Sequence, residues 1–206
     1  AMLAKFRNNG EACTAANRIL VQRPVAEEFA RRLGERMGAL PMGRGVEEGV
    51  VVGPLVNQKA VDKVDELVRD ALDRGATAQL GGAPADRDGY FYPATVLTGV
   101  PAEAQMGSAE IFGPVAAITE FDTEEEAIAL ANDTPFGLIS YVFTQGLDRG
   151  LRVSEALEAG MVGLNQGVVS NPAAPFGGIK ESGVGREGGF TGIDEFLETK
   201  YIGIKV

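Results

Sequence analysis

Strand-like and helix-like segments alternate through the second half of this sequence. Three short apolar runs have the length and composition of strands: 115–121, 138–143 and 161–164. Between them, Thr123 and Glu126 form a capping box that predicts a helix to about Ala131, and residues 147–157 predict a second helix. Because strands that alternate with helices at this spacing tend to lie side by side, we expect an α/β fold with a mostly parallel sheet flanked by helices.

The first half of the sequence adds elements of the same kinds. A strand is expected over 18–22, a helix over 24–37 and another strand over 77–80. The strongest helix pattern begins after Asn57, a favourable N-cap residue, and ends at Gly75. Residues 38–56 contain glycine and proline at intervals without a clear period, so they are predicted to form a long loop.

The C-terminal segment, Lys200 to Val206, is predicted to be a strand that follows a short helix near 193–197. One interpretation makes it an ordinary edge strand of this chain's own sheet. Another pairs it with a sheet edge of another subunit, which would make it an element available for oligomerisation. The sequence favours neither interpretation over the other.

The composition narrows the possible function classes. The sequence has 29 acidic and 19 basic residues, and its net charge of −10 argues against nucleic acid or an anionic membrane as a partner. No apolar run approaches the ~20 residues that span a bilayer. A single cysteine and no expected export signal favour a cytoplasmic location. Because the sequence has no histidine, we expect no Ser-His-Asp or Cys-His site and no His-ligated metal.

Cys13 is the only cysteine, so it forms no internal disulfide and no cysteine-rich metal site. Two interpretations remain from its type alone: an inert buried thiol, which is the commoner case, or a nucleophile. Small polar residues and Gly10 precede it, and they suggest a turn that leads into a helix, where a thiolate is stabilised.

Two further segments have the composition of binding loops. Glu110 and Phe112 stand just before a predicted strand, and in an extended chain both would project to one side, toward a sugar hydroxyl and a flat ring. The alternative is an exposed Glu beside a core Phe. The glycine-rich run 176–183 is either a functional loop or a structural crossover. Residues 183–188 fit G-x-G-x-x-G, but a loop precedes them and little chain follows, so a dinucleotide fingerprint is rejected.

Four segments taken together resemble the C-terminal half of the aldehyde dehydrogenase superfamily. They occur in that family's order and spacing: 6–18, 110–115, 163–165 and 175–189. The resemblance extends from about Leu3 to Val206. Among the members of the superfamily, the sequence is most similar to the succinate-semialdehyde dehydrogenases, through Lys5-Phe6-Arg7-Asn8 and the run 174–188.

This resemblance implies roles for five residues. Cys13 matches the catalytic thiol, which attacks the aldehyde carbon and passes through a thiohemiacetal to a thioester. Glu110 matches the residue that binds the nicotinamide ribose of NAD or NADP, and Phe112 the residue beside the nicotinamide ring. Arg7 and Ser170 match the positions that bind the far carboxylate of a semialdehyde.

The resemblance also implies a division of the family's proteins into parts. Residues 1–198 match the catalytic domain, and 199–206 a terminal strand used in oligomers. The cofactor-binding domain, with the general base and the contacts that separate NAD from NADP, matches nothing in this sequence. We therefore expect the chain alone to be inactive and to self-associate, or to join a separate N-terminal half. The alternative is a non-catalytic fragment or interaction module that needs a partner chain.

Overall fold

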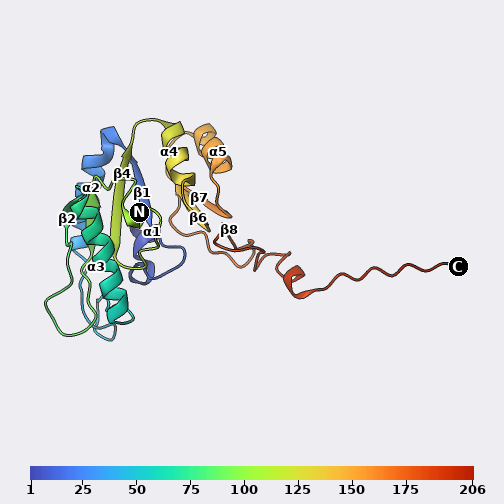
Figure 1. The fold of residues 1–206 in the computed structure, drawn as a ribbon, viewed down its shortest axis with the longest axis horizontal. Helices are drawn as coiled ribbons and strands as arrows, with labels where there is room; N and C mark the ends of the chain where they lie inside the picture. The colour runs from blue at the N-terminus through green and yellow to red at the C-terminus, as the bar shows by residue number, and fades with distance from the viewer.

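The computed structural model describes residues 1–206 and has an α/β fold (Figure 1). The α-helices are α1 (Met2–Phe6), α2 (Arg23–Gly38), α3 (Gln58–Asp73), α4 (Glu124–Asn132) and α5 (Leu147–Ala156). The strands of the main sheet are β1 (Arg18–Gln22), β2 (Thr77–Leu80), β3 (Thr95–Thr98) and β4 (Val115–Phe121). The remaining strands are β5 (Phe136–Gly137), β6 (Ile139–Val142), β7 (Met161–Leu164) and β8 (Ile179–Lys180). The α/β class predicted from the sequence is confirmed.

The main sheet has four strands in the order β1-β4-β3-β2. β4 pairs in parallel with β1 on one side and with β3 on the other, while β2 pairs antiparallel with β3 at the edge. The sheet is therefore mixed, and two of its three strand pairs are parallel, as predicted for a mostly parallel sheet. The sequence analysis did not predict β3, a four-residue strand whose first three residues are buried.

Successive residues of the central strands face opposite layers, as the pleat of a strand requires. Val96 and Ala116 belong to a core cluster with Leu33 and Met37 of α2. Leu97 and Val115, which alternate with them, belong to a second cluster built around α3. The sheet is thus covered by α2 on one face and α3 on the other, and it supplies a rigid support for the segments that lead into β1 and β4.

The expectation that residues 115–164 form one parallel sheet is wrong. Among the strands of this range, β6 and β7 pair in parallel with each other and form a separate two-stranded sheet. β5 pairs antiparallel with β8 in another two-stranded sheet. The physical reason lies in β4, whose two edges are already occupied by β1 and β3, so that no later strand can join it. In Figure 1, α4, α5 and β6 to β8 form a layer beside the main sheet.

The predicted helix starts are confirmed by their capping contacts. The Ala60 amide donates to Asn57 Oδ1 at 3.0 Å before α3, and the Glu126 amide donates to Thr123 Oγ1 at 3.2 Å before α4. Residues 38–56 form the predicted loop, with one isolated bridge between Met42 and Val52.

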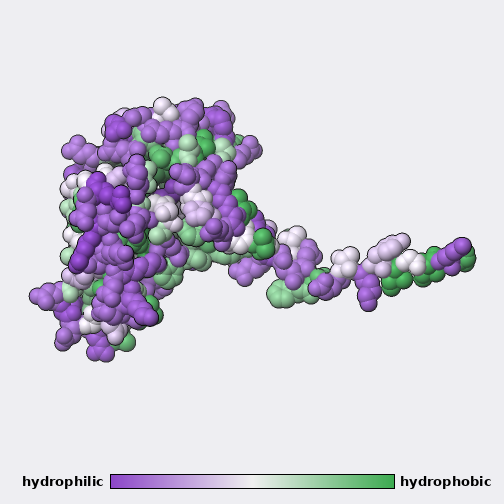
Figure 2. Space-filling view, in the orientation of Figure 1, coloured by the Kyte–Doolittle hydropathy of each residue, from purple (hydrophilic) through white to green (hydrophobic).

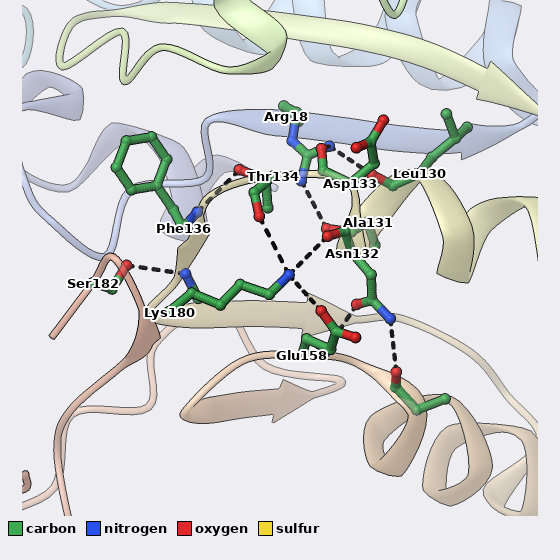
Figure 3. Close-up of polar contacts among 12 residues, drawn as sticks. Arg18, Leu130, Ala131, Asn132, Asp133, Thr134, Phe136, Glu158, Lys180 and Ser182 are labelled. Atoms are coloured by element: carbon green, nitrogen blue, oxygen red, sulfur yellow. Dashed lines mark hydrogen bonds and ion pairs between the residues drawn. The ribbon is translucent and has the colours of Figure 1, made fainter. Parts of the chain in front are cut away.

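A polar network joins the main sheet to the second layer at the C-terminal end of α4 (Figure 3). Arg18, the first residue of β1, donates to the carbonyl oxygens of Leu130 and Ala131 at 2.6 and 2.8 Å. Lys180 of β8 donates to the carbonyl oxygen of Asn132 at 2.8 Å and pairs with Glu158. Two cations therefore satisfy the last carbonyls of α4, where the helix dipole also favours positive charge.

The predicted C-terminal strand is not formed within this chain. A 3-10 helix covers Asp194–Phe196, and residues 198–206 have no regular secondary structure and project away from the body (Figure 1). Tyr201 is 92% exposed, and Figure 2 shows hydrophobic residues along this projecting segment. The interpretation as an edge strand of the chain's own sheet is wrong, whereas pairing with another subunit stays a prediction. No helix of the structure has the length and apolar character needed to cross a membrane.

Candidate functional site

Cys13 lies in a tight turn between α1 and β1. Three residues before it have positive φ, Asn8, Asn9 and Gly10, with values of 51, 61 and 77°. The Ala15 amide then donates to the Ala12 carbonyl oxygen at 2.8 Å and closes a turn around Cys13. The predicted helix after Cys13 is wrong, because β1 follows the turn directly. The thiol is exposed, which excludes the interpretation as an inert buried cysteine.

The loop that carries Glu110 and Phe112 touches the chain just before Cys13. A Cβ on Gly10 would stand 2.3 Å from the Gly113 carbonyl oxygen, so only glycine permits this approach. The positive φ of Gly10 is also a conformation that glycine adopts without strain. Gly10 therefore allows the two segments to pack backbone against backbone.

Asn17 ties the same loop to the chain just after Cys13. Its Nδ2 donates to the carbonyl oxygens of Met106 and Ala109 at 3.0 and 2.9 Å, and its Oδ1 accepts from the Ile111 amide at 2.8 Å. The sequence analysis missed Asn17, and no local pattern could have found it, because its partners lie about ninety residues away in the chain. The segment around Cys13 and the loop with Glu110 are thus joined on both sides of the thiol.

Glu110 and Phe112 are both at the surface, while Ile111 between them is buried. Phe112 has a φ of 54°, so the loop is not extended at that residue, and projection of both side chains to one side stays a prediction. Phe112 is 37% exposed, so it is not a core residue. The loop presents a carboxylate and an aromatic ring to solvent beside the segment that carries Cys13.

Arg7 and Ser170, far apart in the sequence, line one small pocket together with Thr14 and Tyr141. Arg7 Nη2 donates to Thr14 Oγ1 at 3.3 Å. The Tyr141 hydroxyl donates to the Thr14 carbonyl oxygen at 2.9 Å. Thr14 follows Cys13 directly, so the pocket reaches the chain next to the thiol. The sequence analysis missed Thr14 and Tyr141; adjacency to Cys13 was the only signal for Thr14.

Three titratable groups lie close to this region. Burial raises the pKa of Tyr141, which also faces Arg7 and Cys13. Burial lowers the pKa of Lys5 to about 8, an effect that the negative charge of Glu110 partly offsets, and Lys5 is only 1% exposed. Burial also raises the pKa of Glu11, whose Oε1 accepts from the Val56 amide at 3.3 Å. Glu11 is therefore oriented toward residue 56.

The glycine-rich segment 176–189 makes close backbone contacts within this chain. A Cβ on Gly160 would stand 2.0 Å from the Gly177 carbonyl oxygen, and Phe176 forms a bridge with Glu187. Arg186 Nη1 donates to the Gly178 carbonyl oxygen at 2.8 Å. Residues 183–188 are followed by no α-helix, which agrees with the rejection of a dinucleotide fingerprint.

The family model described as "Aldehyde dehydrogenase family" matches residues 1–202. This chain therefore belongs to the aldehyde dehydrogenase family. It is 56% identical over 204 residues to a succinate-semialdehyde dehydrogenase of Paenarthrobacter nicotinovorans, an alignment that covers 99% of this chain and 45% of the relative. The family resemblance seen in the sequence is confirmed.

Solved structures share the fold. A crystal structure of an NADP-dependent enzyme from E. coli superimposes with a TM-score of 0.95 at 48% identity, covering 98% of this chain and 42% of that one. An NAD⁺ complex of an aldehyde dehydrogenase from Bacillus cereus superimposes with a TM-score of 0.91 at 36% identity, covering 96% and 40%. This chain thus spans less than half the length of the relatives that it matches.

Proposed function

We propose that this chain is the thiol-bearing catalytic part of an NAD(P)-dependent aldehyde dehydrogenase, with Cys13 as the nucleophile. The observation that carries the proposal is the exposed thiol in a turn that two distant segments hold in place. The Cys13 thiolate adds to the aldehyde carbon and forms a C–S bond, and the oxygen becomes an oxyanion. We propose the Cys13 amide as one backbone donor for that oxyanion. Loss of hydride leaves a thioester, which water hydrolyses to the carboxylate and the free thiol.

Glu110 and Phe112 fit a nicotinamide cofactor by their chemistry. A solvent-facing carboxylate accepts hydrogen bonds from ribose hydroxyls, and an exposed aromatic ring packs against a flat heterocycle. The cofactor, when bound, supplies the hydride acceptor. The names of the solved relatives include both NADP and NAD⁺, and we propose one of these two for this protein.

Arg7 and Ser170 are proposed to bind the far carboxylate of the substrate, most simply succinic semialdehyde. Arg7 offers a guanidinium fork suited to a carboxylate, and Ser170 a hydroxyl donor, and both line the pocket beside Thr14. The similarity to a succinate-semialdehyde dehydrogenase supports this choice of substrate class.

The remaining proposals concern the whole protein. We assign 1–198 to the catalytic domain and 199–206 to a strand that pairs in an oligomer, supported by the exposed Tyr201 and Ile204. We propose a cytoplasmic location from the single unpaired cysteine. A protein of these 206 residues alone is expected to produce no NAD(P)H from succinic semialdehyde, because a general base and most of the cofactor contacts have no counterpart here. Steady production would contradict that expectation.

Alkylation of Cys13 tests the proposed site, because the protein has one thiol and the product is counted by mass. Succinate is expected to slow the reaction with iodoacetamide, whereas acetate, which has a single carboxylate and a shorter chain, is not. R7M and S170A should lose the protection. R36M, which removes an exposed arginine from α2, should retain it. Equal protection in R7M and in the unaltered protein would contradict the carboxylate site.

A further inference from the structure

Tyr141 projects from β6 of the second layer and reaches the turn that carries Cys13 in the first. Its hydroxyl donates to the Thr14 carbonyl oxygen at 2.9 Å, across 127 positions of the sequence. The contact links β6 of the second layer to the turn before β1, at the residue next to the thiol. Arg18 also joins the two layers, but the Tyr141 contact lies in the pocket itself.

The position of the Tyr141 ring depends on a glycine of the neighbouring strand β7. Tyr141 pairs with Gly163 in the parallel register of β6 and β7. A Cβ on Gly163 would stand 2.9 Å from Tyr141 Cδ1 and 2.8 Å from Val169 Cγ1. Gly163 thus leaves the space in which the ring packs, and the strand pair fixes the direction of its hydroxyl.

Thr14 receives a second contact from the other side of the pocket. Arg7 Nη2 donates to its Oγ1 at 3.3 Å, and Thr14 is only 6% exposed. The side chain of Thr14 is therefore held by Arg7 and its carbonyl by Tyr141. The Thr14–Ala15 peptide, one residue beyond Cys13, has little freedom to rotate while both contacts persist.

We propose that Tyr141 is a positioning residue for Cys13, which it holds through the Thr14 carbonyl from the wall of the pocket that contains Arg7 and Ser170. The inference rests on the proposed role of Cys13. Tyr141 touches neither the reacting carbon nor the cofactor in this scheme. Its donated hydrogen bond withdraws negative charge from the Thr14 carbonyl oxygen, which would otherwise oppose a nearby thiolate. It also limits the orientations of the turn.

Tyr141→Phe removes the hydroxyl and keeps the ring, and the rate of Cys13 alkylation by iodoacetamide is then followed against pH. The midpoint of the profile is expected to move upward by about half a pH unit, the scale set by losing one hydrogen bond. Y201F makes the same chemical change in the exposed C-terminal segment and should leave the profile unchanged. An unchanged midpoint in a folded Y141F protein would overturn the proposal.

Amide hydrogen exchange keeps the test decisive if Y141F also loses stability. The Ala15 amide closes the turn around Cys13, whereas the amide of Val68 lies in the core of α3. Exchange at Ala15 should rise about fivefold relative to exchange at Val68. A parallel rise at both amides would indicate general destabilisation and overturn the positioning role. Because neither readout uses a substrate, failure of succinate protection would count against the carboxylate site alone.

Discussion

Arg18 Nη1 lies 2.6 Å from the carbonyl oxygen of Leu130, and this contact fastens the start of β1 to the end of α4 (Figure 3). A further bond from Arg18 Nη2 reaches Ala131 at 2.8 Å. Arg18 is five residues beyond Cys13 in the sequence. The strand that follows the thiol is therefore fixed at its first residue by the second layer of the fold.

Arg18→Met is expected to lower the free energy of unfolding by about 2 kcal/mol, because partly buried helix carbonyls lose charged donors. Arg18→Lys keeps the charge but loses the fork, and its loss should be smaller. Urea denaturation measures both. Arg36→Met serves as the control because Arg36 is exposed on α2. Equal stability of the R18M and R36M proteins would show that the network does not hold the layers together.

The burial of Lys5 is expected to make the free energy of unfolding depend on pH in an unusual way. Its ordinary pKa of 10.5 applies to the unfolded chain, whereas burial lowers the pKa to about 8 in the folded chain. Between pH 8 and pH 10.5 the unfolded chain binds more protons than the folded chain. The free energy of unfolding therefore rises with pH over this range, by about 3 kcal/mol in all. Below pH 8 the full cost of burying the charge remains.

Lys5→Met should therefore stabilise the protein at pH 7 and abolish the rise at higher pH. Urea denaturation at intervals from pH 7 to 10.5 measures the difference between the variant and the unaltered protein. Lys63→Met, an exposed position on α3, should show the unaltered profile. A difference between K5M and the unaltered protein that does not change with pH would refute this account.

Features set by neighbouring residues were predictable from the sequence. The caps at Asn57 and Thr123 depend on contacts within one helical turn, and both formed, although Glu126 accepts from the Asp122 amide and not from the Thr123 amide that a full capping box uses. The pairing of β4 was not predictable, because its two partners, β1 and β3, lie elsewhere in the sequence, and a local pattern carries no information about distant partners.

The residues of the candidate site also divide into those that the sequence predicted and those that it did not. Arg7 and Ser170 came from a family resemblance, and the structure places both in one pocket. Asn17 and Tyr141 gave no signal, because each acts through backbone groups of a distant segment, and any residue can supply a backbone group. The positive φ of Phe112 was not predictable either, because it is a property of the folded loop and not of the side chain.

Gly10→Ala tests the close approach of the two loops. Gly10 has a φ of 77°, and an added Cβ would stand 2.3 Å from the Gly113 carbonyl oxygen, so both strain and overlap oppose the alanine. We expect a loss of at least ~3 kcal/mol in the free energy of unfolding. Gly99→Ala is matched in backbone, with a φ of 62°, but has no atom within 4 Å, and should lose only about 1 kcal/mol. Similar losses in urea denaturation would show that overlap with Gly113 is unimportant.

Asn17→Asp tests the link between the thiol segment and the loop of Glu110. The substitution keeps the acceptor for the Ile111 amide but turns a second oxygen toward the carbonyls of Met106 and Ala109. We expect a loss of about 2 kcal/mol in the free energy of unfolding at pH 7, because two carbonyls lose their donor and face a charge. Acidification should reduce the loss, since a protonated Asp can donate again and its pKa is raised in the folded state.

Asn171→Asp is the control for this substitution, because Asn171 only accepts, from the Ala173 amide at 2.9 Å, and a carboxylate accepts equally well. Its free energy of unfolding should stay within ~0.5 kcal/mol of the unaltered value. Urea denaturation at pH 7 and pH 4.5 compares the two variants. If N17D lowers the free energy of unfolding equally at both pH values, the loss of the Nδ2 donor is not its cause. Such a result would indicate instead that the loop depends on the shape of Asn17 and not on its hydrogen bonds.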